Sequence, residues 1–266
     1  MQPISELLKQ SQAKALNFDP IQWQVDRMNA VVGNEPGPDC QICKNRRYIA
    51  YAKDGEIMQK PCACLKAARS LLRAQRSGLG QLLEKCTFSS YTASEPWQTT
   101  IKEEAESFAA NPHGWFSING SSGAGKTHLC TAIVSALIAS GKEARYFVWP
   151  DEIRKVKANI NDDYAEDSIS KAKSIEVLYI DDFLKTGDTF NSEKQAFFSV
   201  PPTASDIRLA FEIVNYRSNN NLITIFSSER TLEEINKFDY ALGSRICQMC
   251  GDNSIKLIGD KNYRMR

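Results

Sequence analysis

Residues 115–127, Trp-Phe-Ser-Ile-Asn-Gly-Ser-Ser-Gly-Ala-Gly-Lys-Thr, contain the full pattern G-x-x-x-x-G-K-[ST] of a phosphate-binding loop. The apolar run 115–118 predicts a strand before the loop, and residues 128–140 predict a helix after it. This order turns backbone N–H groups and the positive end of the helix dipole toward a phosphate. A glycine-rich turn that matches by chance is the alternative, and the flanking strand and helix argue against it. The stretch therefore predicts a nucleoside triphosphate site.

The residues of this loop are the predicted ligands of ATP and Mg²⁺. Lys126 is expected to contact the β and γ phosphates, and the Thr127 hydroxyl is expected to hold the magnesium ion. The other loop positions are expected to surround the phosphates with their backbone amides: Gly120, Ser121, Ser122, Gly123, Ala124 and Gly125.

A second acidic motif follows a predicted strand at residues 175–180. The apolar run delivers Asp181 and Asp182 at its carboxyl end, as a Walker B element does. Asp181 is expected to hold Mg²⁺, and Asp182 is expected to orient or polarise the attacking water. Acidic residues in the exit loop of an ordinary core strand are the alternative. A further predicted strand at 144–149 lies between the two motifs.

A third strand is predicted at residues 222–226, and polar groups follow it at the place of a γ-phosphate sensor. We expect Ser228 to take this role, while Ser227 and Glu229 stay open as alternatives. Later in the chain, Arg245 is expected to be an arginine finger, with an ordinary surface cation as the alternative. Cys247 and Cys250 are expected to be buried thiols. A short last strand is predicted at residues 254–258.

Four cysteines form two close pairs ahead of these motifs: Cys40 and Cys43, then Cys62 and Cys64. Residues 48–52 and 56–60 can pair as strands across a turn at Asp54-Gly55, which would return the second pair to the first. Four thiolates suit one tetrahedral Zn²⁺, and a site without an open position is structural. Unligated thiols are the alternative.

Composition limits the other possibilities. The chain has 266 residues, 42% of them hydrophobic, and a net charge of +1, which argues against a protein that coats nucleic acid. It shows neither a signal sequence nor a run of roughly 18 apolar residues, so we expect a cytoplasmic protein that does not cross a membrane. In that reducing compartment, the eight cysteines are better explained as metal ligands or buried thiols than as disulfides.

Helices are predicted at residues 4–16, 20–32, 65–77 and 99–110, the second of them starting after Asp19. The third carries Lys66, Arg69, Arg73 and Arg76 near one face, which is either solvated or a contact for phosphates. Residues 78–98 are expected to be irregular, with aromatic residues that pack against the next domain: Phe88, Tyr91 and Trp97.

Together these elements resemble the AAA+ ATPases of the DnaC/DnaI helicase-loader type, which include many phage relatives and the IstB transposition ATPases. The resemblance covers about residues 40–266. Besides the cysteine module and the two nucleotide motifs, these segments carry it: Ser77-Gly78-Leu79, Thr87-Phe88, Trp97, residues 177–182, residues 206–217, the strand leading into Ser227-Ser228, and Gly243-Ser244-Arg245.

The resemblance implies an α/β fold. Its AAA+ P-loop core would have a five-stranded parallel sheet flanked by helices, with the sensor strand between the P-loop and Walker B strands. A C-terminal helical lid would be absent, and a small zinc-binding module would precede the core. The expected domains are an N-terminal helical segment (1–39), the zinc-binding module with its basic helix (40–76), a connector (77–110) and the AAA+ ATPase domain (111–266).

The resemblance also implies a function, which is loading of the replicative hexameric helicase. ATP would be hydrolysed between subunits of a spiral homo-oligomer, and Arg245 would act on the neighbour's nucleotide. The zinc module would engage the helicase, and the ATPase pore would hold single-stranded DNA near Arg154, Lys155 and Lys157. Three alternatives stay open: an IstB-like helper of a transposase, a small-molecule kinase, and an adaptor that binds nucleotide without hydrolysing it.

Overall fold

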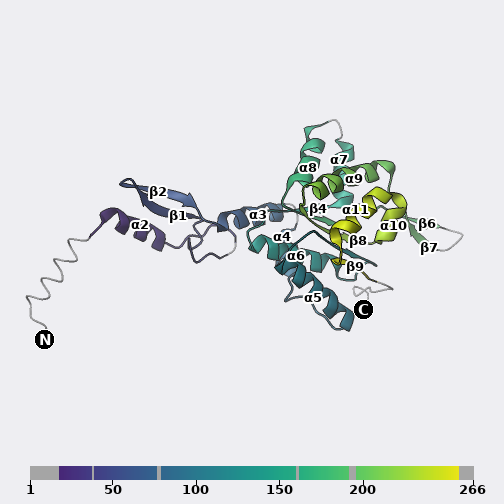
Figure 1. The fold of residues 1–266 in the computed structure, drawn as a ribbon, viewed down its shortest axis with the longest axis horizontal. Coiled ribbons are helices and arrows are strands. Elements are labelled where there is room, and N and C mark those ends of the chain that lie inside the picture. Colours follow the sequence, from purple (N-terminus) through teal and green to yellow (C-terminus); the bar gives the residue numbers. More distant parts are fainter. Residues whose placement is uncertain (1–17, 38, 77–78, 160–161, 192–195, 258–266) are drawn as a thin grey trace, which may run out of the picture. The chain divides into compact units, whose positions relative to one another are not determined.

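The structure is a computed structural model, and it describes residues 18–37, 39–76, 79–159, 162–191 and 196–257 (Figure 1). The chain divides into two compact units, Met1–Arg69 and Ser70–Arg266. The helix predicted at residues 4–16 lies outside the described residues. Among the described helices, none combines the length and hydrophobicity needed to cross a membrane.

The described part of the first unit contains a helix, a β-hairpin and the start of a second helix. Helix α2 (Pro20–Ala30) begins where predicted, because the Asp19 carboxylate accepts hydrogen bonds from the first backbone amides. Strands β1 (Tyr48–Lys53) and β2 (Glu56–Pro61) pair in antiparallel fashion, with Lys53 opposite Glu56. The predicted turn at Asp54-Gly55 is confirmed, since both residues have positive φ angles, +53° and +82°. Helix α3 (Cys64–Arg76) starts in this unit.

The second unit is built on a five-stranded sheet with the order β4-β5-β8-β3-β9, in which every neighbouring pair is parallel. The strands are β3 (Trp115–Asn119), β4 (Ala144–Val148), β5 (Val177–Asp181), β8 (Ile223–Ser228) and β9 (Ser254–Lys256). The predicted arrangement is confirmed, because the sensor strand β8 lies between the P-loop strand β3 and the Walker B strand β5. The carboxyl ends of these three strands therefore meet at one edge of the sheet.

Helices cover both faces of the sheet (Figure 1). One apolar cluster packs β3, β5 and β8 against α4 (Gly80–Lys85), α5 (Pro96–Ala110) and α6 (Lys126–Ala139). The other cluster packs the sheet against the remaining helices: α7 (Trp149–Ala158), α8 (Asp163–Ser174), α9 (Ala204–Asn219), α10 (Leu232–Phe238) and α11 (Tyr240–Cys250). Strands buried on both faces explain why the motif strands are continuous apolar runs in the sequence.

Two expectations need correction. The segment 78–98 is not irregular throughout, because it contains α4 and the start of α5. A six-residue helix beside glycines is too short to show a helical period, and burial of Leu83 holds it in place. Of the two late cysteines, Cys250 is buried as predicted, but Cys247 is exposed. The predicted packing of Phe88, Tyr91 and Trp97 against the core is confirmed.

A second hairpin, which the sequence did not predict, leaves the core after the Walker B strand. Its strands are β6 (Asp188–Asn191) and β7 (Ala196–Ser199), and they form a separate two-stranded sheet. Figure 1 shows the hairpin at the side of the second unit, next to α10.

Candidate functional site

The predicted phosphate-binding loop connects β3 to α6 and has the backbone that such a loop requires. Gly125 stands before the first residue of α6 with φ +86°, and a Cβ there would lie 3.1 Å from the Tyr91 ring. Gly120 has φ +150°, and its Cβ would lie 2.7 Å from the Cβ of Leu257. Both positions therefore need glycine for conformation and for space.

The loop borders a cavity of about 530 Å³, a volume in the range of small-molecule sites. Residues far apart in the sequence line it: Leu82, Cys86, Ser122, Gly123, Ala124, Gly125, Lys126, Thr127, His128, Tyr146, Asp181, Asp182, Lys185 and Glu229. The structure thus brings both predicted nucleotide motifs to one cavity. Some lining residues were not predicted from the sequence: Leu82 and Cys86 before the core, Tyr146 on β4, and Lys185 in the loop after β5.

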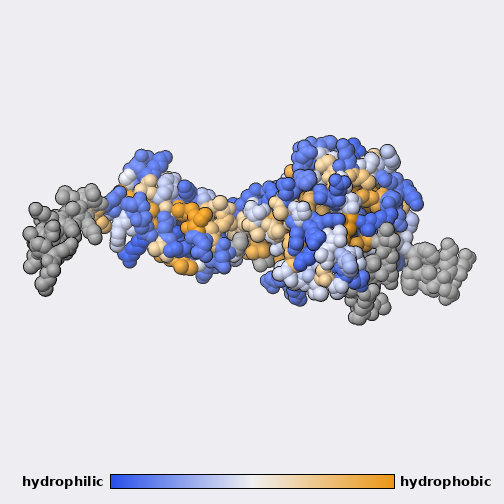
Figure 2. Space-filling view, turned by 60° about the horizontal axis from the view of Figure 1, so that its bottom comes forward, coloured by the Kyte–Doolittle hydropathy of each residue, from blue (hydrophilic) through white to orange (hydrophobic). Residues whose placement is uncertain are grey.

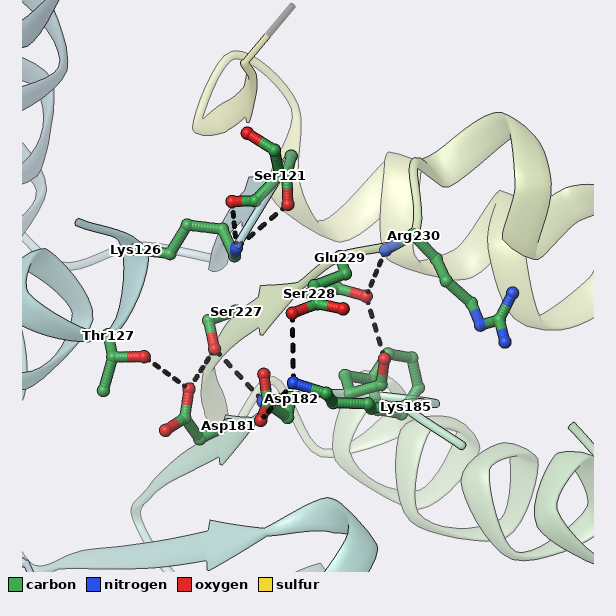
Figure 3. Close-up of polar contacts among 12 residues, drawn as sticks. Ser121, Lys126, Thr127, Asp181, Asp182, Lys185, Ser227, Ser228, Glu229 and Arg230 are labelled. Atoms are coloured by element: carbon green, nitrogen blue, oxygen red, sulfur yellow. Dashed lines mark hydrogen bonds and ion pairs between the residues drawn. The ribbon is translucent and has the colours of Figure 1, made fainter. Parts of the chain in front are cut away.

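Lys126 is buried and donates hydrogen bonds to two carbonyl oxygens of its own loop (Figure 3). Its Nζ lies 2.9 Å from the Gly120 oxygen and 2.8 Å from the Ser121 oxygen. Burial lowers the pKa of the Lys126 ammonium, and the carboxylates of Glu229 and Asp182 act in the opposite direction. The ammonium thus lies against the backbone of the loop, close enough to Glu229 and Asp182 to be affected by their charges.

Asp181 accepts hydrogen bonds from four hydroxyl groups. Thr127 Oγ1 donates to Asp181 Oδ1 over 3.2 Å. This hydrogen bond brings the two predicted magnesium ligands together. The Tyr179 hydroxyl donates to Oδ1 over 2.8 Å, and the Tyr146 hydroxyl donates to Oδ2 over 2.7 Å. Ser227 Oγ donates to Oδ1 as well (Figure 3). Burial and the charge of Asp181 raise the pKa of both tyrosines, so they remain protonated donors that fix this carboxylate.

Asp182 has a left-handed backbone with φ +53°, and its amide donates to Ser227 Oγ over 3.2 Å. This conformation is uncommon outside glycine and is typical of functional sites. Burial raises the pKa of the Asp182 carboxyl, and the charge of Asp181 adds to the effect. Lys185 opposes it, because its Nζ lies 3.2 Å from Asp182 Oδ2.

The end of β8 differs from the expected arrangement. Ser228 is fully buried and does not line the cavity, since its hydroxyl donates to the Phe183 carbonyl oxygen over 2.8 Å. The Arg230 amide in turn donates to Ser228 Oγ over 3.0 Å. Ser227 faces Asp181, and Glu229 lines the cavity. The structure therefore does not bring Ser228 to the position of a sensor.

Arg245 lies on α11 and does not line this cavity. Its guanidinium stands over the Phe211 ring, 5.0 Å from the centroid, and donates to the Ala241 carbonyl oxygen over 3.3 Å. The structure therefore does not bring Arg245 together with the two predicted nucleotide motifs.

The three cations expected near DNA are paired with acidic residues. Arg154 contacts Asp151 over 3.1 Å, and Lys155 contacts Glu152 over 3.0 Å. Lys157 pairs with Asp206, the carboxylate that also caps α9 through Thr203. These residues therefore do not form an unpaired cationic surface on α7.

The four predicted zinc ligands form one cluster, in which all sulfur atoms lie within 4.8 Å of one another. Two of the Sγ–Sγ separations are 3.8 Å, from Cys40 to Cys62, and 3.4 Å, from Cys43 to Cys64. Zinc–sulfur bonds of about 2.3 Å in a tetrahedron require sulfur separations of roughly 3.8 Å. The cluster therefore fits a zinc ion with four thiolates.

Arg47 provides a positive charge beside this cluster and was missed in the sequence. It is almost fully buried, and its Nη1 lies 3.5 Å from Cys64 Sγ. Its Nη2 donates to the Glu35 carbonyl oxygen over 2.8 Å, which ties the segment before the first cysteine pair to the cluster. A guanidinium at this place offsets the negative charge of several thiolates.

Comparison with known proteins identifies relatives of this arrangement. The family model for the bacterial DnaA ATPase domain matches residues 87–250. In sequence, the chain is similar to the phage-like element PBSX protein XkdC of Bacillus subtilis (strain 168). The identity is 31% over 246 residues, which cover 85% of this chain and 86% of XkdC.

Solved structures share the fold. The DnaC helicase loader has a TM-score of 0.52 at 18% identity, covering 67% of this chain and 98% of the loader. The replication initiator DnaA bound to AMPPCP and single-stranded DNA has a TM-score of 0.51 at 20% identity, covering 68% of this chain and 52% of DnaA.

Proposed function

The chain belongs to the family of the bacterial DnaA ATPase domain, and from this membership we propose that it is an ATP-dependent loader of a replicative helicase. The observation that carries the proposal is the single cavity that joins Lys126 and Thr127 to Asp181 and Asp182. A separate unit with a cysteine cluster precedes this site. The similar fold of the DnaC helicase loader supports the choice of partner.

The cavity has the groups that ATP hydrolysis requires. The loop amides and Lys126 bind the phosphates, and the apolar edge formed by Leu82 and Cys86 takes the base. Thr127 and Asp181 would hold Mg²⁺, and the ion would supply positive charge that neutralises the phosphates. Asp182 polarises the attacking water. DnaA in complex with AMPPCP supports the assignment of the nucleotide.

Hydrolysis takes place in an assembly of several copies. Arg245 stands outside the cavity of its own chain, as expected of a residue that acts on the nucleotide of a neighbour. In other P-loop proteins, an arginine supplied by a second protein stabilises the negative charge of the transition state. Arg245 of a neighbouring copy has this role here. ATP binding then favours the assembled state that grips single-stranded DNA, and hydrolysis releases it.

The first unit binds the helicase and holds Zn²⁺ through Cys40, Cys43, Cys62 and Cys64. Figure 2 shows hydrophobic residues gathered on its surface. Val32 and Ile42 are 72% and 69% exposed, and a backbone hydrogen bond from Gly33 to Lys44 brings their segments together. Exposed apolar side chains on a small, metal-stabilised unit are suited to binding another protein.

The two structural neighbours are a replication initiator and a helicase loader, so the alternative of a transposase helper is not favoured. The kinase and adaptor alternatives predict different results in the assay that tests the loader.

The test mixes the purified full chain with a replicative hexameric helicase, with and without ATP, and measures the complex by size-exclusion chromatography with light scattering. Binding of the helicase to single-stranded DNA is measured on the same samples. We expect an ATP-sensitive complex that increases this binding, and Lys126→Ala should abolish the ATP effect. A chain that binds ATP and duplex DNA but no helicase would refute the loader assignment.

A further inference from the structure

The cavity has an excess of carboxylates on the side where the γ-phosphate would lie. Asp181, Asp182 and Glu229 all line it, and a phosphate cannot accept a hydrogen bond from an ionised carboxylate. The hydroxyls at the end of β8 are already used, since Ser227 donates to Asp181 and Ser228 donates to the Phe183 carbonyl. Strand β8 therefore gives no side-chain donor to this side of the cavity among its described residues.

Lys185 supplies a donor at this place. Its Nζ lies 3.0 Å from Glu229 Oε1 and 3.2 Å from Asp182 Oδ2, between two carboxylates that line the cavity (Figure 3). Among the described residues of the cavity lining, it is the one lysine besides Lys126. The Lys185 side chain is about one third exposed, so its ammonium can reach a ligand without unfolding of the loop.

Lys185 carries its charge at neutral pH. Its partial burial alone would lower the pKa of the ammonium, but the hydrogen bond with Glu229 and the charges of Asp182 and Glu229 raise the pKa above its usual value.

The loop that carries Lys185 is fixed to the end of β8. The Phe183 amide donates to the Ser227 carbonyl oxygen over 2.8 Å. Buried Arg230 donates from Nε to the Leu184 carbonyl oxygen over 3.0 Å, and Leu184 has a left-handed backbone with φ +57°. On the other side of Lys185, Arg230 Nη2 donates to Thr186 Oγ1 over 3.1 Å. These contacts hold the backbone before and after Lys185, so its side chain is aimed rather than free.

We propose that Lys185 is a ligand of the γ-phosphate and that Glu229, at the end of the sensor strand, positions it. The inference rests on the proposed function, since it requires ATP in this cavity. Glu229 cannot donate to a phosphate itself, but its carboxylate holds an ammonium that can. When the γ-phosphate is present, Lys185 exchanges its contact with Asp182 for a phosphate oxygen and keeps the contact with Glu229. The exchange also leaves Asp182 Oδ2 free to accept a hydrogen bond from the attacking water.

The test compares binding of AMPPCP and ADP, each with Mg²⁺, to the full chain by isothermal titration calorimetry. The wild-type chain should prefer AMPPCP. Lys185→Met should weaken AMPPCP binding by about 10- to 100-fold, the range for a lost hydrogen bond between charged groups, and should change ADP binding by less than about 3-fold. Lys185→Arg should keep most of the preference. Glu229→Gln should lose part of it, and Glu229→Asp should recover part of that loss.

Lys171→Met is the matched control, because Lys171 is an exposed lysine that pairs with Asp167 away from the cavity. Equal losses for AMPPCP and ADP in Lys185→Met would overturn the proposal in favour of a general electrostatic effect. Unchanged binding with faster hydrolysis would overturn it as well, since Lys185 would then restrain Asp182. A wild-type chain that binds neither nucleotide would refute the proposed function itself, whereas the other two outcomes would leave it intact.

Discussion

Removing the metal from the cysteine cluster should unfold the described part of the first unit, residues 18–37 and 39–69, and leave the second unit folded. The first unit has little else to hold it. Apart from cysteines, its described buried apolar side chains are Val25, Ala50, Ala67 and Ala68. Burial of a valine side chain contributes about 1.5–3 kcal/mol, and an alanine methyl contributes about 0.8 kcal/mol. Such a core cannot offset the conformational entropy lost by so many ordered residues.

The magnitude of the metal effect follows from the geometry of the four sulfurs. Two of their separations are 3.4 Å and 3.8 Å and all are within 4.8 Å, which suits a tetrahedral zinc ion, so the protein needs little rearrangement to bind it. Structural zinc contributes roughly 10–16 kcal/mol to small modules of this kind, which matches or exceeds the total stability of a typical domain. Loss of the ion should therefore convert the unit from folded to unfolded rather than weaken it.

The assay treats the reduced full chain with a zinc chelator and follows metal content, limited proteolysis and nucleotide binding on the same sample. Cys43→Ser should act like the chelator, because Cys43 is buried in the cluster. Cys247→Ser is the matched control, since Cys247 is an exposed cysteine on α11. Proteolysis should start within residues 18–69, with nucleotide affinity unchanged. A metal-free chain with the same protease resistance would refute the reasoning.

Three further predictions concern the second unit. Arg245→Ala should bind nucleotide normally but lose turnover in the assembled state, and normal turnover would remove this arginine from the site. Arg217 is fully buried and donates to carbonyl oxygens at the end of α8 and on β8. Arg217→Met should therefore lower the free energy of unfolding, measured in urea, by more than about 4 kcal/mol. A decrease below about 1 kcal/mol would contradict this. Burial raises the pKa of Asp182, so its carboxylate takes up a proton at a higher pH than an ordinary aspartate does. Turnover should accordingly fall on acidification at that higher pH, and a pH–rate profile that falls only at the ordinary value would exclude Asp182 as the group responsible.

Local motifs were predictable because neighbours in the sequence determine them. The backbone of residues 120–127 follows from glycines and a helix start, and the hairpin of the first unit follows from the turn at Asp54-Gly55. The cysteine pairs then meet because that hairpin returns the chain. The resemblance implied a five-stranded parallel sheet with the sensor strand between the P-loop and Walker B strands, and the structure confirms this arrangement.

Contacts across the sheet were not predictable in the same way. Tyr146 reaches Asp181 from the neighbouring strand, 35 positions away in the sequence, and no local pattern marks it as part of the site. Lys185 and Glu229 are separated by 44 positions, and no local pattern marks Lys185 as part of the site. Helix α4 depends on the burial of Leu83 rather than on its own propensity.

The sequence by itself determined that this protein has a P-loop motif, two acidic residues at the end of a second strand, and four cysteines in two close pairs. Only the tertiary structure decided which serine at the end of β8 faces the site. Successive side chains of a strand point to opposite faces, and the register pairs Ile180 with Phe226 and Asn119 with Ser228. That register directs Ser227 to Asp181 and turns Ser228 away, and a shift by one residue would exchange them.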